Sequence, residues 1–133
     1  MSSVKPSPTI SDYNRPFYEY ASKHELRLQK CNDCGEFWSP PGPVCVNCLS
    51  TDYTWSQVSG KGTLASWVIF HKVYYPEFGD EIPYNVGLVE LAEGPRLLTN
   101  IIGTPSSSLA RGTPLTVIFE DRPDCTVPQF TLA

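Results

Sequence analysis

The residues of this chain whose types and spacing best suit chemistry are four cysteines in two close pairs. Cys31, Cys34, Cys45 and Cys48 follow the pattern C-x2-C-x10-C-x2-C. Each pair can form a tight turn that points backbone amides at the sulfurs, and together the pairs present four thiolates for tetrahedral coordination of Zn²⁺. Because four cysteines fill every coordination position, the pattern predicts one structural zinc ion per chain, with no open position for water or substrate.

Two alternatives to zinc use the same thiolates. A single iron ion would make the chain a redox protein, but the sequence offers no second redox group. A pair of disulfides requires an oxidising compartment. The chain has five cysteines, an odd number, and no apolar N-terminal run of the kind found in secretory signals. We therefore expect a reduced, cytoplasmic protein with zinc at this site.

The residue that follows each cysteine pair affects how the turn closes. Gly35 follows Cys34 and supplies the permissive backbone that such a turn favours. Leu49 stands at the equivalent place after Cys48 and predicts a looser second turn. This difference removes no metal ligand.

Three further residues are candidates for chemistry. Cys125 stands apart from the pairs, and the sequence identifies neither the base nor the electropositive setting that a nucleophilic cysteine needs. We interpret it as a packed or inert surface thiol; an independent small enzyme that uses Cys125 is the alternative. His24 is expected on the solvated face of a helix. His71 is a candidate for orienting a ligand or partner, with a hydrogen-bonded structural role as the alternative.

The elements that must position these residues are mostly strands. We expect a flexible tail over residues 1–12, a helix capped by Asp12 over 13–25, and a lead-in strand before residue 30. The zinc ribbon then covers 31–52 and a β-barrel covers 53–133. Strands are predicted over 53–58, 62–72, 84–90, 96–102 and 115–120, with a closing segment over 127–132. The fold class is therefore mainly β, and five short strands match the size of an OB-fold. A small sandwich is the alternative.

Charge and hydropathy exclude some classes of partner. The formal net charge is -4 and no basic stripe is present, which argues against nucleic acid held by phosphate contacts. No apolar run approaches the roughly 20 residues that cross a bilayer, so we expect no membrane span. The irregular stretch from Val73 to Pro83 is rich in aromatic residues, and long loops of this kind are often functional.

Several stretches together resemble one family. They are LRLQKCNDCGEFWSPPGPVCVNC, W-x-x-V-S-G-K-G-T, PYNVGLVELAEGPRLLTNIIG and VPQF, in that order along the chain. The sequence from about Tyr13 onward is similar to the zinc-ribbon plus OB-fold proteins of the domain of unknown function thirty-five, which are associated with acyl-CoA metabolism. The ribbon of this family is rubredoxin-like, and the four cysteines above match its ligands.

The resemblance implies a function that the residues alone do not. Members of the family partner thiolase-superfamily subunits, as in archaeal acetoacetyl-CoA thiolase assemblies, a steroid retro-aldolase and benzoylsuccinyl-CoA thiolase. We therefore expect a required, non-catalytic accessory subunit whose partner supplies the catalytic cysteine and the acyl-CoA substrate, with CoA contacted in the complex. A stand-alone binding module for nucleic acid or protein is the alternative. The resemblance suggests that one segment contacts the partner or lines a substrate channel, with the candidates His71, Tyr74, Tyr75, Phe78, Pro83 and Tyr84.

Overall fold

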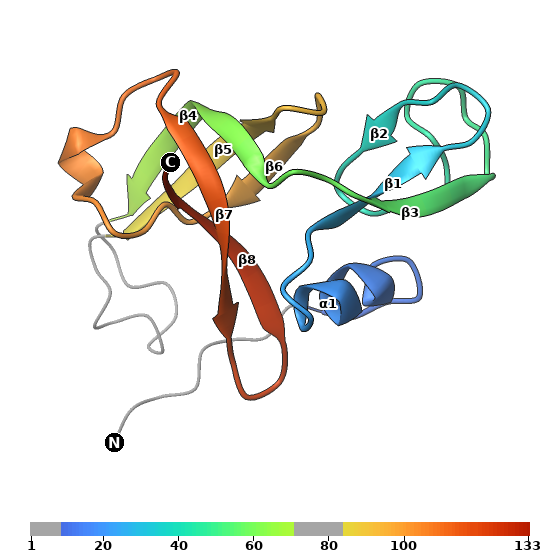
Figure 1. The fold of residues 1–133 in the computed structure, drawn as a ribbon, viewed down its shortest axis with the longest axis horizontal. Helices are drawn as coiled ribbons and strands as arrows, with labels where there is room; N and C mark the ends of the chain where they lie inside the picture. The colour runs from blue at the N-terminus through green and yellow to red at the C-terminus, as the bar shows by residue number, and fades with distance from the viewer. Residues whose placement is uncertain (1–8, 71–83) are drawn as a thin grey trace.

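The computed structural model describes residues 9–70 and 84–133, and it has two parts joined side by side (Figure 1). The elements are α1 (Arg15–Ala21), β1 (Arg27–Cys31), β2 (Phe37–Trp38), β3 (Tyr53–Gln57), β4 (Lys61–Phe70), β5 (Tyr84–Leu91), β6 (Arg96–Thr99), η2 (Ser106–Ser108), β7 (Pro114–Asp121) and β8 (Thr126–Leu132). The ribbon is an antiparallel sheet of order β2-β1-β3, and the barrel is a five-stranded sheet of order β6-β5-β4-β7-β8. The prediction of a mainly β fold with one short helix, a zinc ribbon and an OB-like barrel is confirmed. No helix within the described ranges is long and apolar enough to span a membrane.

Helix α1 begins later than the sequence predicted. Asn14, and not Asp12, occupies the N-cap position. The side chain of Asn14 accepts a hydrogen bond from the backbone of Ser11 at 2.7 Å, whereas Asp12 pairs with Arg15 at 2.9 Å. The prediction of Asp12 as the cap is therefore wrong, because an ion pair with the first helical residue occupies its carboxylate.

The end of α1 is set by a residue with left-handed backbone. His24 has φ +58, and the backbone N–H of Glu25 reaches back to the carbonyl of Tyr20 at 3.0 Å. This is the bond that closes a helix when the preceding residue turns left-handed. His24 therefore lies beyond the helix, so its predicted place within the helix is wrong, whereas its predicted exposure to solvent is confirmed.

Strand β3 belongs to the ribbon sheet and not to the barrel. It pairs with β1 along its whole length, from Arg27 opposite Gln57 to Cys31 opposite Tyr53. The interpretation of residues 53–58 as the first barrel strand is therefore wrong. Alternation of side chains indicates that a segment is a strand. Which strand it pairs with depends on the path of the chain through the cysteine turns.

The barrel obtains its fifth strand from the closing segment. Residues predicted only as a closing piece form β8, which pairs with β7 from Leu115 opposite Leu132 to Asp121 opposite Thr126. The sheet curls shut where the chain after β6 meets β8: Ile101 and Phe130 form a parallel bridge, and Ile102 donates to the carbonyl of Phe130 at 2.9 Å. Closure of this kind removes exposed edges.

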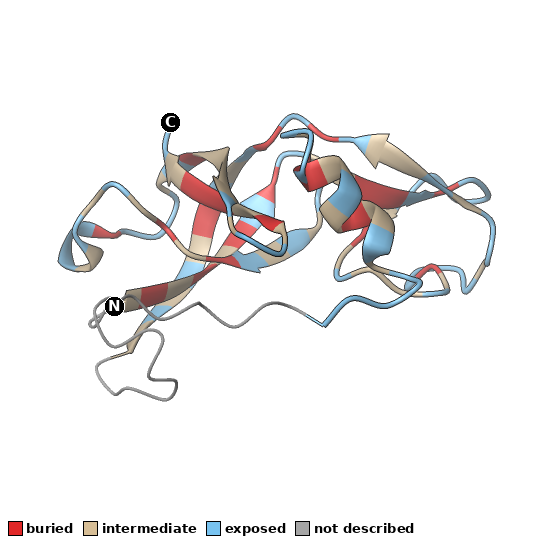
Figure 2. Cartoon of the chain, turned by 90° about the horizontal axis from the view of Figure 1, so that it is seen from below, coloured by how far each residue is buried: buried red, intermediate tan, exposed pale blue. Residues whose placement is uncertain are grey.

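One hydrophobic core connects the two parts. Helix α1 contributes Phe17, the residue before β1 contributes Leu26 and β1 itself contributes Leu28, and these cluster with barrel residues that include Phe130. Figure 2 shows buried positions on the helix, on the ribbon strands and on the barrel strands. Val58 donates to the carbonyl of Leu26 at 2.9 Å where the chain passes from ribbon to barrel. The buried apolar members of this core are Phe17, Leu26, Leu28, Val58, Leu64, Val89, Leu91, Ile101, Leu109, Leu115 and Phe130. The ribbon is therefore anchored on the barrel by shared packing.

The first corner of the barrel depends on Gly60. Its φ is +77, and a Cβ there would lie 2.3 Å from the Cγ1 of Val117. The carbonyl of Gly60 also accepts a hydrogen bond from the backbone of Val117 at 2.8 Å. A side chain at this position would push apart the β4–β7 contact that starts the barrel.

Candidate metal centre and the adjoining cleft

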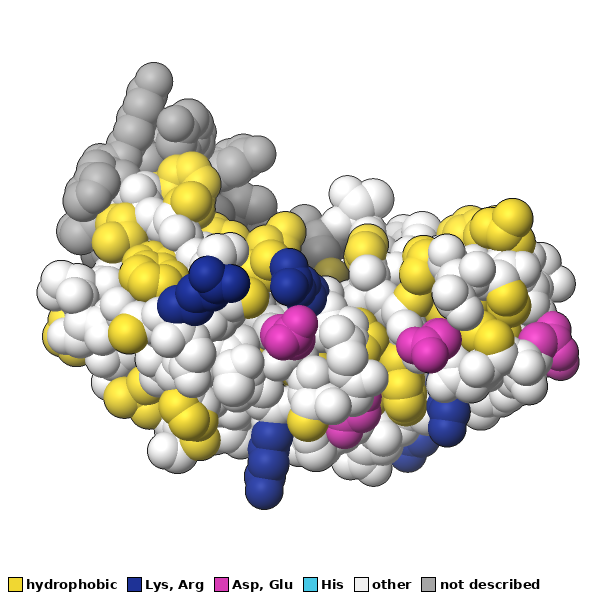
Figure 3. Space-filling model, turned by 90° about the horizontal axis from the view of Figure 1, so that it is seen from above, with side chains coloured by type: hydrophobic (Ala, Val, Ile, Leu, Met, Phe, Trp, Pro, Cys, Tyr) yellow, Lys and Arg dark blue, Asp and Glu magenta, His cyan; other side chains and the backbone are white. Residues whose placement is uncertain are grey.

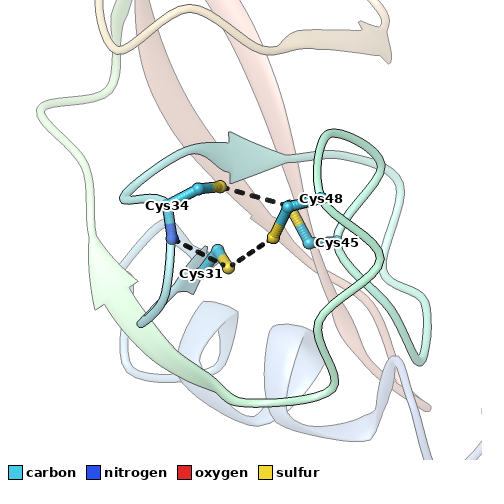
Figure 4. A group of neighbouring side chains, drawn as sticks. All are labelled: Cys31, Cys34, Cys45 and Cys48. Carbon is cyan, nitrogen blue, oxygen red and sulfur yellow. Dashed lines mark hydrogen bonds between the residues drawn. The ribbon is translucent and has the colours of Figure 1, made fainter.

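The four predicted cysteines meet at one point, from the end of β1, from the turn before β2 and from the loop before β3 (Figure 4). Their sulfur atoms all lie within 4.8 Å of one another, with 3.5 Å between Cys31 and Cys48 and 3.6 Å between Cys34 and Cys45. Zinc–sulfur bonds of about 2.3 Å place the sulfurs of a tetrahedral site about 3.8 Å apart. The cluster therefore has the size that a four-thiolate zinc site requires.

Both cysteine turns direct backbone amides at sulfur, as the spacing predicted. The N–H of Cys34 lies 3.4 Å from the sulfur of Cys31, and the N–H of Asn47 lies 3.3 Å from the sulfur of Cys45. Such amides stabilise thiolate charge. They also help to hold the sulfur atoms of Cys31 and Cys45 in position.

The second turn is as tight as the first, so the prediction of a looser turn at Leu49 is wrong. Gly35 donates to the carbonyl of Cys31 at 3.0 Å with φ +81. Leu49 donates to the carbonyl of Cys45 at 2.9 Å with φ +64. The surrounding ribbon therefore holds a leucine in the backbone conformation that glycine adopts more readily.

The pKa of Cys48 determines how zinc binding at this site would depend on pH. The backbone at Ser50 lowers the pKa of Cys48, whereas the thiol of Cys31, desolvation and the thiols of Cys34 and Cys45 raise that pKa, to about 12 overall. With its pKa raised in this way, the thiol of Cys48 keeps its proton near neutral pH. A zinc ion bound here would displace protons, so its affinity would rise with pH.

A small apolar cluster and a buried glutamine support the metal centre. Trp38 packs beside Cys31 and Cys45, and its ring meets Tyr53 edge to face at 5.5 Å. Gln29 is buried in β1, where its side chain donates to the carbonyl of Gly42 at 2.7 Å and accepts from the N–H of Gly42 at 2.8 Å. Gln29 therefore pins the loop between the two cysteine pairs, a role that its sequence context does not reveal.

The remaining chemical candidates lie apart from the metal centre. Cys125 is half-buried in the β7–β8 turn, where burial raises the pKa of its thiol. A raised thiol pKa fits the interpretation of an inert cysteine. His24 stacks on Phe119 with ring centroids 5.1 Å apart, and its Nε2 lies 3.2 Å from a carboxylate oxygen of Asp121.

Of the residues predicted to contact a partner, one falls in a described strand. Tyr84 begins β5 and stacks on Phe70, with ring centroids 5.1 Å apart. The candidates His71, Tyr74, Tyr75, Phe78 and Pro83 lie outside the described residues.

The outer face of β4, β5 and β6 carries apolar side chains in register. Val68 lies opposite Val86, and Leu88 lies opposite Leu98. Val68 is 56% exposed and Leu98 is 70% exposed. A barrel face that meets only water normally carries polar side chains at such positions, so this apolar outer face is a feature that requires an explanation.

The apolar outer face continues into a cleft between barrel and ribbon. The cleft has a volume of about 650 Å³. Leu88 and Leu98 line it from the barrel, Pro40 and Pro41 from the ribbon, and Phe17 from α1. Its charged lining is Arg96, which lies 3.5 Å from Glu90, and Arg122, which lies 2.9 Å from Glu120. The sequence did not predict this cleft, because its walls come from segments that are far apart along the chain.

The fold and site define a zinc ribbon joined to an OB-fold. Residues 19–54 match the family described as "ChsH2, rubredoxin-like zinc ribbon domain", and residues 55–120 match "ChsH2, C-terminal OB-fold domain". The solved structure titled "Ltp2-ChsH2(DUF35) aldolase" contains a chain that is 35% identical, with a TM-score of 0.86 over 95% of this chain and 98% of that one. The protein therefore belongs to the family of ChsH2 zinc-ribbon and OB-fold (DUF35) domains.

Two curated relatives extend the comparison. A protein of Thermomonospora curvata named "Probable enoyl-CoA hydratase alpha subunit" is 36% identical over 96% of this chain. "Benzoylsuccinyl-CoA thiolase subunit BbsA" of Thauera aromatica is 27% identical over 62% of this chain. The chain covers 40% of the length of the first protein and 55% of the second. These names describe subunits of enzymes that act on CoA thioesters.

Proposed function

We propose that this protein is a non-catalytic accessory subunit, stabilised by a structural zinc ion, of a thiolase-superfamily enzyme complex. The complex would cleave a carbon–carbon bond in a bulky β-ketoacyl or β-hydroxyacyl-CoA, by thiolysis or by retro-aldol chemistry. The names of the relatives support a subunit role in acyl-CoA chemistry. The reduced four-thiolate site is in keeping with a cytoplasmic location, which stays a prediction.

The observation that carries this proposal is the apolar outer face of β4, β5 and β6, continuous with the cleft. Exposed apolar surface of this kind marks protein contact sites when it is contiguous. Val68 and Leu98 are exposed on it, and Leu98 also lines the cleft. A partner subunit that covered the face would remove both from water, which stabilises the complex by about 25 cal/mol for each Å² of apolar area buried.

The test is co-expression with the thiolase-superfamily subunit of the same organism, followed by size-exclusion chromatography with zinc analysis. We expect co-elution with one zinc per copy of this chain, and loss of co-elution for a Val68→Gln, Leu98→Gln double variant. Leu132→Gln is the matched control, because Leu132 is exposed on the barrel but lies in β8. A wild-type chain that never co-elutes would overturn the proposal, and binding of single-stranded oligonucleotide instead would favour the stand-alone module.

Contact with the acyl-CoA is a finer part of the proposal, and we direct it at the cleft. Arg96 is half-exposed there and is held by a long ion pair with Glu90, so it can turn toward an anionic group of a CoA thioester. We expect Arg96→Gln to raise the KM of the assembled complex for its thioester while zinc content and co-elution stay unchanged. An unchanged KM would remove the CoA contact from the proposal and leave the accessory role standing.

A further inference from the structure

The two cysteine turns are equivalent in backbone but different in their side chains. The first reads C-N-D-C-G and the second reads C-V-N-C-L. Asn32 in the first turn therefore corresponds to Val46 in the second, and Gly35 corresponds to Leu49. The features that both turns share, which are the cysteines and the backbone conformation, are those that the metal site requires. The side chains that differ between the turns serve other purposes.

The first turn uses its polar side chains inside the ribbon. Asn32 donates to the carboxylate of Asp52 at 2.9 Å and accepts from the hydroxyl of Thr54 at 3.1 Å. Asp33 accepts a hydrogen bond from the hydroxyl of Ser50. These contacts tie the first turn to the segment that leads into β3.

The second turn presents apolar side chains to solvent. Val46 is 73% exposed and Leu49 is 72% exposed, the highest values among the large hydrophobic residues of the described chain. Leu49 also adopts φ +64, which is unfavourable for a residue with a Cβ. An exposed leucine in a strained backbone conformation lowers the free energy of unfolding relative to glycine at the same position. This cost indicates that the side chain of Leu49 serves a contact with another molecule.

The charges around the second turn restrict what can bind it. The sequence contains no lysine or arginine between Lys30 and Lys61. The charged residues of this stretch, Asp33, Glu36 and Asp52, are all acidic and exposed. Figure 3 shows hydrophobic side chains at the ribbon end with acidic side chains beside them, and lysine or arginine side chains only on the lower side of that half. Lys30 of β1 lies over the ring of Phe37, with its Nζ 5.4 Å from the ring centroid. Such a surface repels phosphates and anionic lipids, and it complements an apolar hollow edged by basic groups.

We propose that Val46 and Leu49 of the second cysteine turn dock into an apolar hollow, edged by lysine or arginine side chains, on the partner enzyme subunit. This inference rests on the proposed function and adds a contact at the ribbon tip to the outer face of the barrel. Docking here would also cover Cys34 and Cys48, the two exposed cysteines of the site. Zinc in the complex would then be lost to a chelator more slowly than zinc in the free chain.

The test replaces the second turn with the chemistry of the first. In a Val46→Asn, Leu49→Gly double variant, the metal ligands stay and the apolar tip is removed. The dissociation constant for the purified thiolase-superfamily subunit is measured by titration calorimetry, with zinc content checked beforehand and Leu132→Gln as control. We expect the double variant to bind about tenfold or more weakly and the control to bind within about twofold of the wild type. Chelator protection should be lost in parallel.

The outcomes distinguish this inference from the proposed function. If the wild type binds the partner and the double variant binds equally well, the ribbon-tip contact is wrong and the accessory role stands. If the wild type does not bind, both are wrong. A double variant that changes self-association instead of partner binding would also overturn the inference. If the double variant loses zinc, Val46→Asn alone is used and is expected to weaken binding in the same direction.

Discussion

Leu49 occupies the same place in the second cysteine turn as Gly35 does in the first, with the same left-handed backbone and the same closing hydrogen bond. The two closing bonds are 2.9 Å and 3.0 Å long. The ribbon therefore imposes one turn geometry on two different residues. The difference between them is a side chain that is exposed and a backbone conformation that glycine adopts without strain.

The first prediction concerns the strain at Leu49. Replacing Leu49 with glycine relieves an unfavourable φ that costs about 1 kcal/mol or more. Glycine also increases the conformational entropy of the unfolded chain, which offsets part of this gain in stability. We expect Leu49→Gly to raise the free energy of unfolding of the zinc-loaded protein by up to about 1 kcal/mol, measured by urea titration. Leu49→Ala keeps the strain and should give no gain. A loss of stability in the glycine variant would show that the leucine packs against the ribbon.

The second prediction concerns the metal centre. Removal of zinc by a strong chelator should unfold the ribbon around Trp38, because its apolar cluster contains two of the ligands. We expect the tryptophan fluorescence to shift to longer wavelength, and a Trp38→Phe variant to show a smaller shift, because Trp55 of β3 also lies in the ribbon sheet. Cys45→Ser should lower zinc affinity by orders of magnitude, whereas Cys125→Ser should keep one zinc per chain. Equal zinc loss in both serine variants would contradict the assignment of the four ligands.

The sequence predicted the features that local patterns determine. The spacing of the cysteines predicted which side chains cluster as a group that could hold a metal ion, and alternation identified most strands to within a few residues. It did not identify the partner of β3, since the Cys31–Tyr53 register arises only after the cysteine turns have folded the chain back.

Two buried polar residues were also missed, for the same physical reason. Gln29 and Asn85 lie within strands, where a polar side chain normally indicates a solvated face. Each is buried instead because a distant backbone segment supplies its hydrogen bonds. A sequence pattern contains the polar residue but not the segment that will meet it.

The third prediction tests the role of Asn85. Its side-chain amide donates to the carbonyl of Ile101 at 2.8 Å and accepts from the N–H of Ile101 at 2.7 Å, next to the bridge that closes the barrel. Asn85→Leu would leave both buried backbone groups of Ile101 without these partners, so we expect a loss of about 2–4 kcal/mol in the free energy of unfolding. Ser106→Ala removes only a neighbouring bond of Asn85, 3.1 Å long, and should cost about 1 kcal/mol or less. Similar losses in both variants would contradict the role of Asn85 in closure.

The fourth prediction concerns a contact between the end of α1 and the β7–β8 turn. The hydroxyl of Thr126 donates to Asp121 at 2.8 Å, and Nε2 of His24 lies 3.2 Å from the same carboxylate. Thr126, and after it His24, lowers the pKa of Asp121. A carboxyl whose folded pKa is lowered stabilises the fold above its unfolded pKa of about 3.9, and this stabilisation is lost as pH falls through the folded value. The wild type should therefore be more stable than Asp121→Asn near neutral pH, with the difference vanishing in acid.

The two partners of Asp121 should differ in their effects. Because the hydroxyl of Thr126 is the larger cause of the lowered pKa, Thr126→Val should raise the pKa of Asp121 more than His24→Asn does. Asparagine is suitable at position 24 because it tolerates the left-handed backbone found there. Carboxyl carbon titration by nuclear magnetic resonance measures both shifts directly. An unchanged Asp121 titration in the valine variant would mean that the hydroxyl does not set its acidity, and the acid-range stability difference would then need another carboxyl as its source.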